Sequence, residues 1–193
     1  GVSVSIIEGG DIGLPSLDRS PWLEHDSEVG GMLRDLGTHA FAPLVAAGLL
    51  SSEAEVCSAT LAKFTADRSG IEPVINRNDV EMYICAQLAY RDIPILVAFG
   101  KLPQQGGEWS LAVRGSKGMF FTALRRVQPP AVVISNDGEM KLLRLSVSHS
   151  EFVLEEASMF YRGLLPSFDG NIDALRVSLE INKKIRDAYF SSR

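Results

Sequence analysis

The chain has 193 residues, of which 46% are hydrophobic and 22% charged, a composition typical of one soluble domain with a single sizeable core. Its formal net charge is −5 and its pI is about 5.2, and no cluster of lysine and arginine alternates with aromatic residues, so nucleic acid and anionic membranes are poor partners. No apolar run reaches the roughly eighteen residues that span a bilayer, and the N-terminus lacks the pattern of a signal peptide, which predicts a cytoplasmic protein.

The N-terminal quarter predicts a strand, a loop and one long helix. Residues 2–8 form an apolar-rich strand, and a strand that starts so early indicates that the chain begins inside a fold. A loop rich in glycine and proline follows. A helix is expected from about residue 27 to residue 47, with Gly48 as its left-handed C-cap. A kink is expected just beyond His39, because Pro43 lacks the amide that would bond the His39 carbonyl.

The middle of the chain predicts strands and its end predicts helices. Turn residues separate seven further stretches with strand-like patterns, at residues 55–64, 80–90, 93–100, 108–114, 119–124, 131–135 and 141–147. Their short connections predict antiparallel pairing, because parallel neighbours need long crossovers. Two helices follow, the first with a capping box at Ser148 and Glu151 and the last after Gly170. The expected fold class is α+β, a large mostly antiparallel sheet with helices packed on one face.

Two further expectations concern the sheet. Strands such as residues 80–90 carry apolar side chains on both faces, so the face without helices is expected to have a covering layer of its own. Cys57 and Cys85 are expected to be buried thiols, since neither belongs to a CxxC or Cys/His pattern, and neither a metal site nor a disulfide is predicted.

Residues 30–39, GGMLRDLGTH, carry the strongest candidate for chemistry. On one helix, Asp35 and His39 stand four residues apart on the same face, so both can address a substrate hydroxyl. Histidine exchanges a proton near neutral pH and a carboxylate can orient it, which suits the oxidation of an alcohol if another group takes the hydride. The alternative is an ordinary surface pair. Gly37 weakens a helix, and a close approach of backbone or cofactor, or a tight helix–sheet contact, would explain it.

The order Gly-Gly, three residues, Asp, one residue, Gly, one residue, His resembles the motif that opens the C-terminal domain of the glucose-fructose oxidoreductase and inositol dehydrogenase (Gfo/Idh/MocA) family. Residues 109–118 resemble that family's strand before a Gly-Ser/Thr-Lys-Gly turn, and residues 171–186 resemble its closing helix. The resemblance covers nearly the whole chain. It implies a glyceraldehyde-3-phosphate dehydrogenase-like C-terminal domain over residues 1–193, with the N-terminal Rossmann domain outside this sequence.

The resemblance implies the substrate-side half of an NAD(P)-dependent oxidoreductase that oxidises or reduces a sugar, a polyol or a related hydroxy compound. NAD or NADP would be bound mainly by the N-terminal domain, so these residues alone are expected to be inactive. His39 would be the catalytic acid or base, and Asp35 would orient it or contact the substrate. Asp18 and Trp22 fall where relatives place substrate-binding residues, although Trp22 also suits a packing anchor. Lys101 is a third substrate-binding candidate, although a solvated strand end is the simpler interpretation.

In relatives the second sheet face packs on the same sheet of another subunit, which implies a homodimer or larger homo-oligomer, with a monomer as the alternative. Two other functions stay open. The chain could be a ligand-sensing module of the same architecture, or a purely structural dimerisation domain, and neither of these would turn over a substrate.

Overall fold

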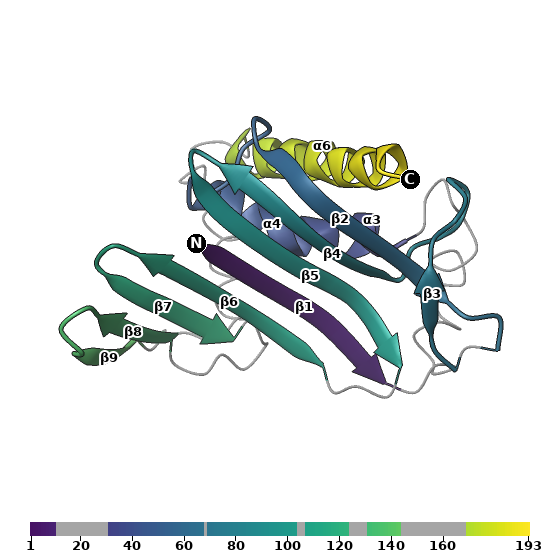
Figure 1. Ribbon diagram of the computed structural model, residues 1–193. Coiled ribbons are helices and arrows are strands. Elements are labelled where there is room, and N and C mark those ends of the chain that lie inside the picture. Colours follow the sequence, from purple (N-terminus) through teal and green to yellow (C-terminus); the bar gives the residue numbers. More distant parts are fainter. Residues whose placement is uncertain (11–30, 68, 104–106, 124–130, 144–168) are drawn as a thin grey trace, which may run out of the picture.

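The computed structural model describes residues 1–10, 31–67, 69–103, 107–123, 131–143 and 169–193. These residues form a nine-stranded sheet and the helices α3 (Met32–Asp35), α4 (Gly37–Ala46) and α6 (Asp169–Ser191). The strands are β1 (Val2–Gly10), β2 (Glu55–Phe64), β3 (Ile71–Pro73), β4 (Tyr83–Tyr90), β5 (Ile93–Pro103), β6 (Glu108–Gly115), β7 (Gly118–Ala123), β8 (Ala131–Ser135) and β9 (Met140–Leu143). This large sheet with helices against one face confirms the predicted α+β fold class (Figure 1).

The first strand lies in the middle of the sheet. The spatial order is β3-β2-β4-β5-β1-β6-β7-β8-β9, in which β1 is parallel to β5 and the other neighbouring pairs are antiparallel. The predicted hairpin between β4 and β5 is present, and Arg91 and Asp92 have the positive φ angles, 49° and 64°, that a two-residue hairpin turn requires. The sheet is therefore mostly antiparallel, as predicted, with one parallel pair at its centre.

The predicted long helix is divided in two. Its first part, α3, ends at Asp35, and α4 begins at Gly37, so the interruption lies at Leu36 and not beyond His39 as predicted. Helix α4 continues through Pro43 to Ala46. The predicted C-cap is confirmed, since Gly48 has a φ of 69°. The start of the predicted helix and the capping box at residues 148 and 151 lie outside the described residues.

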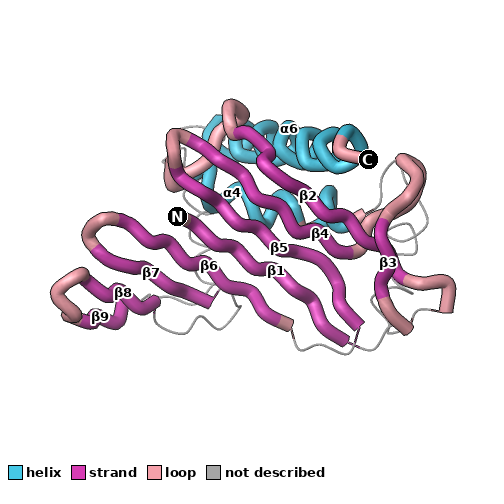
Figure 2. The backbone as a smooth tube through the Cα atoms, in the orientation of Figure 1, coloured by secondary structure: helices cyan, strands magenta, loops and turns pink. Residues whose placement is uncertain are grey.

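The core lies between the helices and one face of the central strands (Figures 1 and 2). Alternate residues of β1 and β5, among them Ile6 and Phe99, are fully buried on this face. Phe41 of α4 meets Phe99 edge-on with 5.7 Å between ring centroids, and Ile181 and Ile185 of α6 are also fully buried. Each such side chain contributes about 1.5–3 kcal/mol of hydrophobic stabilisation, so packing fixes α4 and α6 on the sheet.

The other face of the sheet is not covered by any described helix, and strands β6–β9 extend beyond the helices (Figure 2). Cys57 is exposed and Cys85 is half-buried, so the prediction of two buried thiols is wrong. Both lie on strands whose pattern predicted burial, but they belong to the uncovered side, and the β2–β4 register shifts between Val56 and Ser58. Strand β3 was also missed, because three exposed residues show no periodicity.

Candidate active site

A residue from a distant part of the chain holds the N-terminus of α3. The main-chain N–H of Met32 donates to the main-chain oxygen of Glu81 at 2.9 Å, and the N–H of Leu33 donates to Glu81 Oε1 at 3.3 Å. A helix leaves such amides without acceptors at its start, and α3 has no side-chain cap of its own. Gly31 has a φ of 91°, and a Cβ there would overlap the Glu81 carboxylate. Glycine at this position therefore permits the cap.

Glu81 is also bound from α6. Its side chain is only 2% exposed, and its Oε2 accepts a hydrogen bond from Arg186 Nη1 at 2.6 Å. Burial raises the pKa of Glu81, and the charge of Arg186 and the amide hydrogen bonds oppose part of that rise. Glu81 thus joins the start of α3, the segment before β4, and α6. Sequence reasoning missed both Glu81 and Arg186.

Asp35 and His39 fall on different helices. Asp35 is half-buried at the end of α3, and His39 is exposed in the first turns of α4, with Leu36 between the helices in a helical conformation at φ −93°. The Thr38 hydroxyl donates to the main-chain oxygen of Asp35 at 3.4 Å. Within the part of the chain that the structure describes, no hydrogen bond or ion pair joins the Asp35 carboxylate to the His39 ring. The pair is therefore adjacent in the chain but not preassembled.

The ring of His39 contacts Trp109 instead. Their centroids are 5.9 Å apart at an interplanar angle of 46°. Trp109 lies on β6 directly opposite Ile6 of β1, so its side chain points to the face that bears the helices. Sequence reasoning placed Trp109 in a family-like strand but gave it no role. This contact with the Trp109 ring limits the orientation of the exposed imidazole.

Lys101 lies on the same face and is not a solvated strand end. It follows Val97 and Phe99 at alternate positions of β5, both of which are buried. Its side chain is 14% exposed, and its Nζ lies 3.6 Å from Oε2 of Glu8, its register partner on β1. The end of β1 therefore carries an ion pair on the face where His39 and Trp109 also lie.

The structure describes three of the five predicted site residues. The structure places His39 and Lys101 on the helix-bearing side of the sheet, and Asp35 lies on α3, just before the helix that carries His39. Asp18 and Trp22 lie outside the described residues. Among the residues that are described, no group of three or more histidine, cysteine, aspartate or glutamate side chains converges as metal ligands would.

A cleft of about 790 Å³ opens beside α3 and α6, and Glu81, Arg186, Arg34 and Asn182 line part of it. Asn182 is 5% exposed, and among the residues that the structure describes neither its amide nitrogen nor its amide oxygen has a hydrogen-bond partner. A Cβ at Gly37 would overlap this amide. Gly37, the third glycine of the motif, therefore permits a close contact between helices α4 and α6, and this contact is not with the sheet.

Replacing Gly37 with alanine is expected to lower the free energy of unfolding by about 2 kcal/mol, because the added methyl must displace a buried amide. Asn182→Ala is expected to cost little, since it removes two polar atoms that have no partner. The double variant G37A/N182A should be at least as stable as N182A in urea unfolding, because the overlap is gone and alanine favours a helix more than glycine does. Additive losses would contradict this explanation of Gly37.

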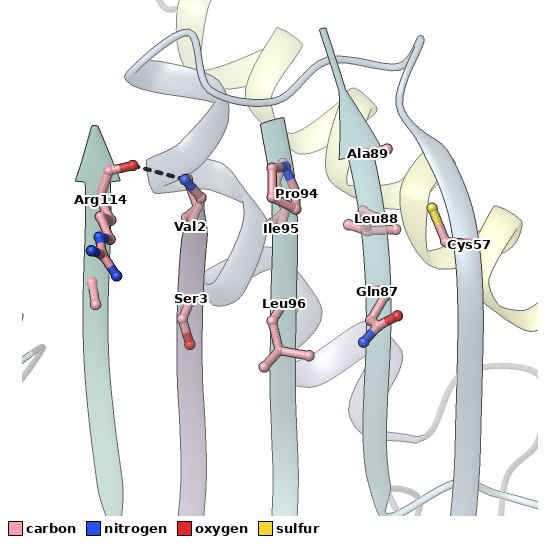
Figure 3. Close-up of a pocket in the computed structure, with 12 residues that line it drawn as sticks. Val2, Ser3, Cys57, Gln87, Leu88, Ala89, Pro94, Ile95, Leu96 and Arg114 are labelled. Atoms are coloured by element: carbon pink, nitrogen blue, oxygen red, sulfur yellow. Dashed lines mark hydrogen bonds between the residues drawn. The ribbon is translucent and has the colours of Figure 1, made fainter. Parts of the chain in front are cut away.

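A separate pocket of about 460 Å³ lies on the uncovered sheet face (Figure 3). Leu96, Gln87 and Ser3 contribute side chains from three neighbouring strands, and Cys57 lies at its edge. The main-chain oxygen of Arg114 accepts a hydrogen bond from the N-terminal amine at 2.7 Å. This pocket lies on the side of the sheet away from α3 and α4, so it is not part of the site that contains His39.

No protein-family model matches the chain, and no curated protein matches it. Solved structures do match. One is KijD10, a 3-ketoreductase from Actinomadura kijaniata in complex with NADP and TDP-benzene, with 22% identity, a TM-score of 0.64, and 97% of this chain and 53% of that chain covered. The probable oxidoreductase yhhX matches with 14% identity and a TM-score of 0.55, covering 96% of this chain and 54% of that one.

A third structure is UDP-N-acetylglucosamine 3-dehydrogenase GnnA from Acidithiobacillus ferrooxidans, with 12% identity, a TM-score of 0.58, and 98% of this chain and 53% of that chain covered. Identities this low establish the fold alone. The chain spans about half the length of these structures. The chain therefore has the α+β fold of one half of these oxidoreductase structures.

In the described residues no helix has both the length and the apolar character needed to cross a membrane.

Proposed function

We propose that this chain is the substrate-side, C-terminal domain of an NAD(P)-dependent oxidoreductase of the Gfo/Idh/MocA type, acting on a sugar, a polyol or a related hydroxy compound. One observation carries the proposal: Asp35 and His39 of the GG-x₃-D-x-G-x-H motif lie on α3 and α4, in a fold shared with three oxidoreductase structures over 96–98% of the chain. Two of those proteins have names that specify a reaction at a sugar or keto position.

His39 is the proposed proton-transfer group. The imidazole would take the hydroxyl proton when the alcohol is oxidised and would return it in the reduction. NAD(P) would supply the hydride acceptor or donor for the carbon that bears this hydroxyl. His39 is exposed, so a substrate can reach it, and Trp109 limits the orientations of its ring. Asp35 would contact the substrate or the imidazolium once the substrate is bound. Lys101 would bind a hydroxyl or anionic group of the substrate, and this contact would replace its ion pair with Glu8.

We assign no dinucleotide site to the described residues. Glycines 9, 10 and 13 do not match the GxGxxG turn that places a pyrophosphate at a helix N-terminus. NAD or NADP would therefore be bound mainly by a further, N-terminal domain, and none of the residues described above is assigned to it. The cytoplasmic location also stays a prediction from the sequence.

The coding sequence upstream of Gly1 tests this arrangement. We expect it to continue in frame through a βαβ unit with a glycine-rich turn and a Glu-Lys-Pro-like segment. The protein with that domain should turn over a sugar or polyol with NAD(P), and residues 1–193 alone should not. A start codon immediately upstream of Gly1, or dehydrogenase activity of the isolated chain, would contradict the proposal and favour a ligand-sensing or dimerisation module.

We further propose that the uncovered sheet face associates with a second copy of the chain. Large apolar side chains on this face are 40–64% exposed: Leu96, Met119, Phe121, Met140 and Leu142. Exposed apolar patches of this kind mark interaction surfaces. The same face would serve a purely structural dimerisation domain, so association alone does not decide between the two functions.

Replacing Leu96 and Phe121 together with glutamate is expected to dissociate the oligomer, because two charges would be buried without partners. Sedimentation equilibrium should show the mass fall to that of the monomer. The matched control is Ile75→Glu, at a residue that is 68% exposed in the loop after β3. If the mass of the double variant were unchanged, the proposal that the uncovered sheet face is the interface would be contradicted.

A further inference from the structure

The buried carboxylate of Glu81 accepts hydrogen bonds from two helices. It lies before β4 with its side chain 2% exposed, and a buried charge is costly compared with a well-packed apolar side chain. Its oxygens are used by two elements from elsewhere in the sequence, with Oε1 accepting from the Leu33 amide and Oε2 from Arg186. What this carboxylate holds in place is therefore the start of α3.

Helix α3 depends on that cap. It has only four residues, too few to be stable without tertiary support, and its own N-cap residue, Gly31, offers no side chain. Met32 and Leu33 are buried, which fixes where the helix sits, while the hydrogen bonds to Glu81 fix the direction of its first turn. Asp35 ends this helix and His39 follows in the next, so a rotation of α3 moves both side chains.

We infer that Glu81 is a positioning residue, which orients Asp35 and His39 toward the substrate through the hydrogen bond from the Leu33 amide to its Oε1, while Arg186 balances the buried charge of the carboxylate. This inference rests on the proposed function for the roles of Asp35 and His39. A shift of about 1 Å in a reacting group can lower a rate about 10²-fold. A shorter side chain at position 81, which moves the acceptor away from the Leu33 amide, should therefore lower kcat.

Two variants of the complete protein distinguish the effect of the length of the side chain at position 81 from the effect of its charge. Glu81→Asp keeps the charge and withdraws the carboxylate by one methylene. The double variant E81Q/R186Q keeps an acceptor oxygen at full reach and removes both charges. The measurements are hydrogen exchange at the Leu33 amide and the steady-state kcat and KM with NAD(P). Glu72→Gln is the control, since it removes an exposed carboxylate whose partner is Lys63 in an ion pair of 3.6 Å.

For Glu81→Asp we expect at least about tenfold faster exchange at Leu33 and an about tenfold lower kcat, with KM for the cofactor within about twofold. E81Q/R186Q should stay within about threefold of the wild type in both measurements. A loss of stability alone would lower Tm without changing kcat well below the transition. The inference is overturned if E81D leaves exchange and kcat unchanged, or if E81Q/R186Q is as impaired as E81D. Absence of turnover in the wild type would count against the proposed function instead, while exchange at Leu33 still tests the cap.

Discussion

Replacing His39 with alanine in the complete protein is expected to lower kcat by about 10²–10⁴-fold, the usual contribution of a general acid or base. Alanine removes the group that takes the proton from the substrate hydroxyl, and it leaves the buried face of α4, including Phe41 and Leu44, unchanged. KM for the cofactor should stay close to that of the wild type, because His39 lies on the substrate side. The measurement is steady-state turnover with NAD(P).

The control for this experiment is Lys117→Ala. Lys117 is exposed in the turn between β6 and β7, away from α3 and α4, and its loss should change turnover little. If His39→Ala kept kcat within about threefold of the wild type, histidine would not be the proton-transfer group. A wild-type protein that binds a sugar but never turns it over would favour the ligand-sensing alternative.

Gly31→Ala is expected to destabilise the protein by about 3 kcal/mol and to displace the start of α3. Two costs combine, since the backbone at φ 91° is strained for any residue with a side chain, and the added Cβ would overlap the Glu81 carboxylate. Exchange at the Leu33 amide should rise together with the loss of stability. Chemical denaturation and hydrogen exchange measure the two effects.

Gly48→Ala separates the two costs. Gly48 also has a positive φ, 69°, but a Cβ there would meet no atom within 4 Å. This variant should therefore lose only the conformational term, about 1 kcal/mol, with no change at Leu33. If Gly31→Ala cost no more than Gly48→Ala, the overlap with Glu81 would not explain why glycine stands at position 31.

The sequence predicted the sheet well where the information is local. Residues 55–64 and 131–135 form strands with the predicted bounds, because alternation and flanking turn residues define such elements without reference to the rest of the chain. The position of β1 between β5 and β6 was not predicted. Register between strands that lie far apart in sequence depends on packing of the whole sheet, which no local pattern describes.

The site could be predicted only in part, for the same reason. Spacing brought out Asp35 and His39, whereas Glu81 bonds to partners 48 and 105 residues away and has no local pattern that marks it. A signal for Lys101 was present. The alternation that buries Val97 and Phe99 continues to position 101, so extending the predicted strand 93–100 by one residue would have placed the lysine on the helix-bearing face.

The most direct test of the proposed function is a crystal structure of the complete protein with NADP bound. We expect a Rossmann domain that presents the nicotinamide to the helix-bearing face of the sheet, with the His39 imidazole within hydrogen-bond reach of a substrate hydroxyl beside it. Asp35 and Lys101 should face the same space. A nicotinamide on the uncovered sheet face, or one far from His39, would contradict the assignment of this segment as the catalytic one.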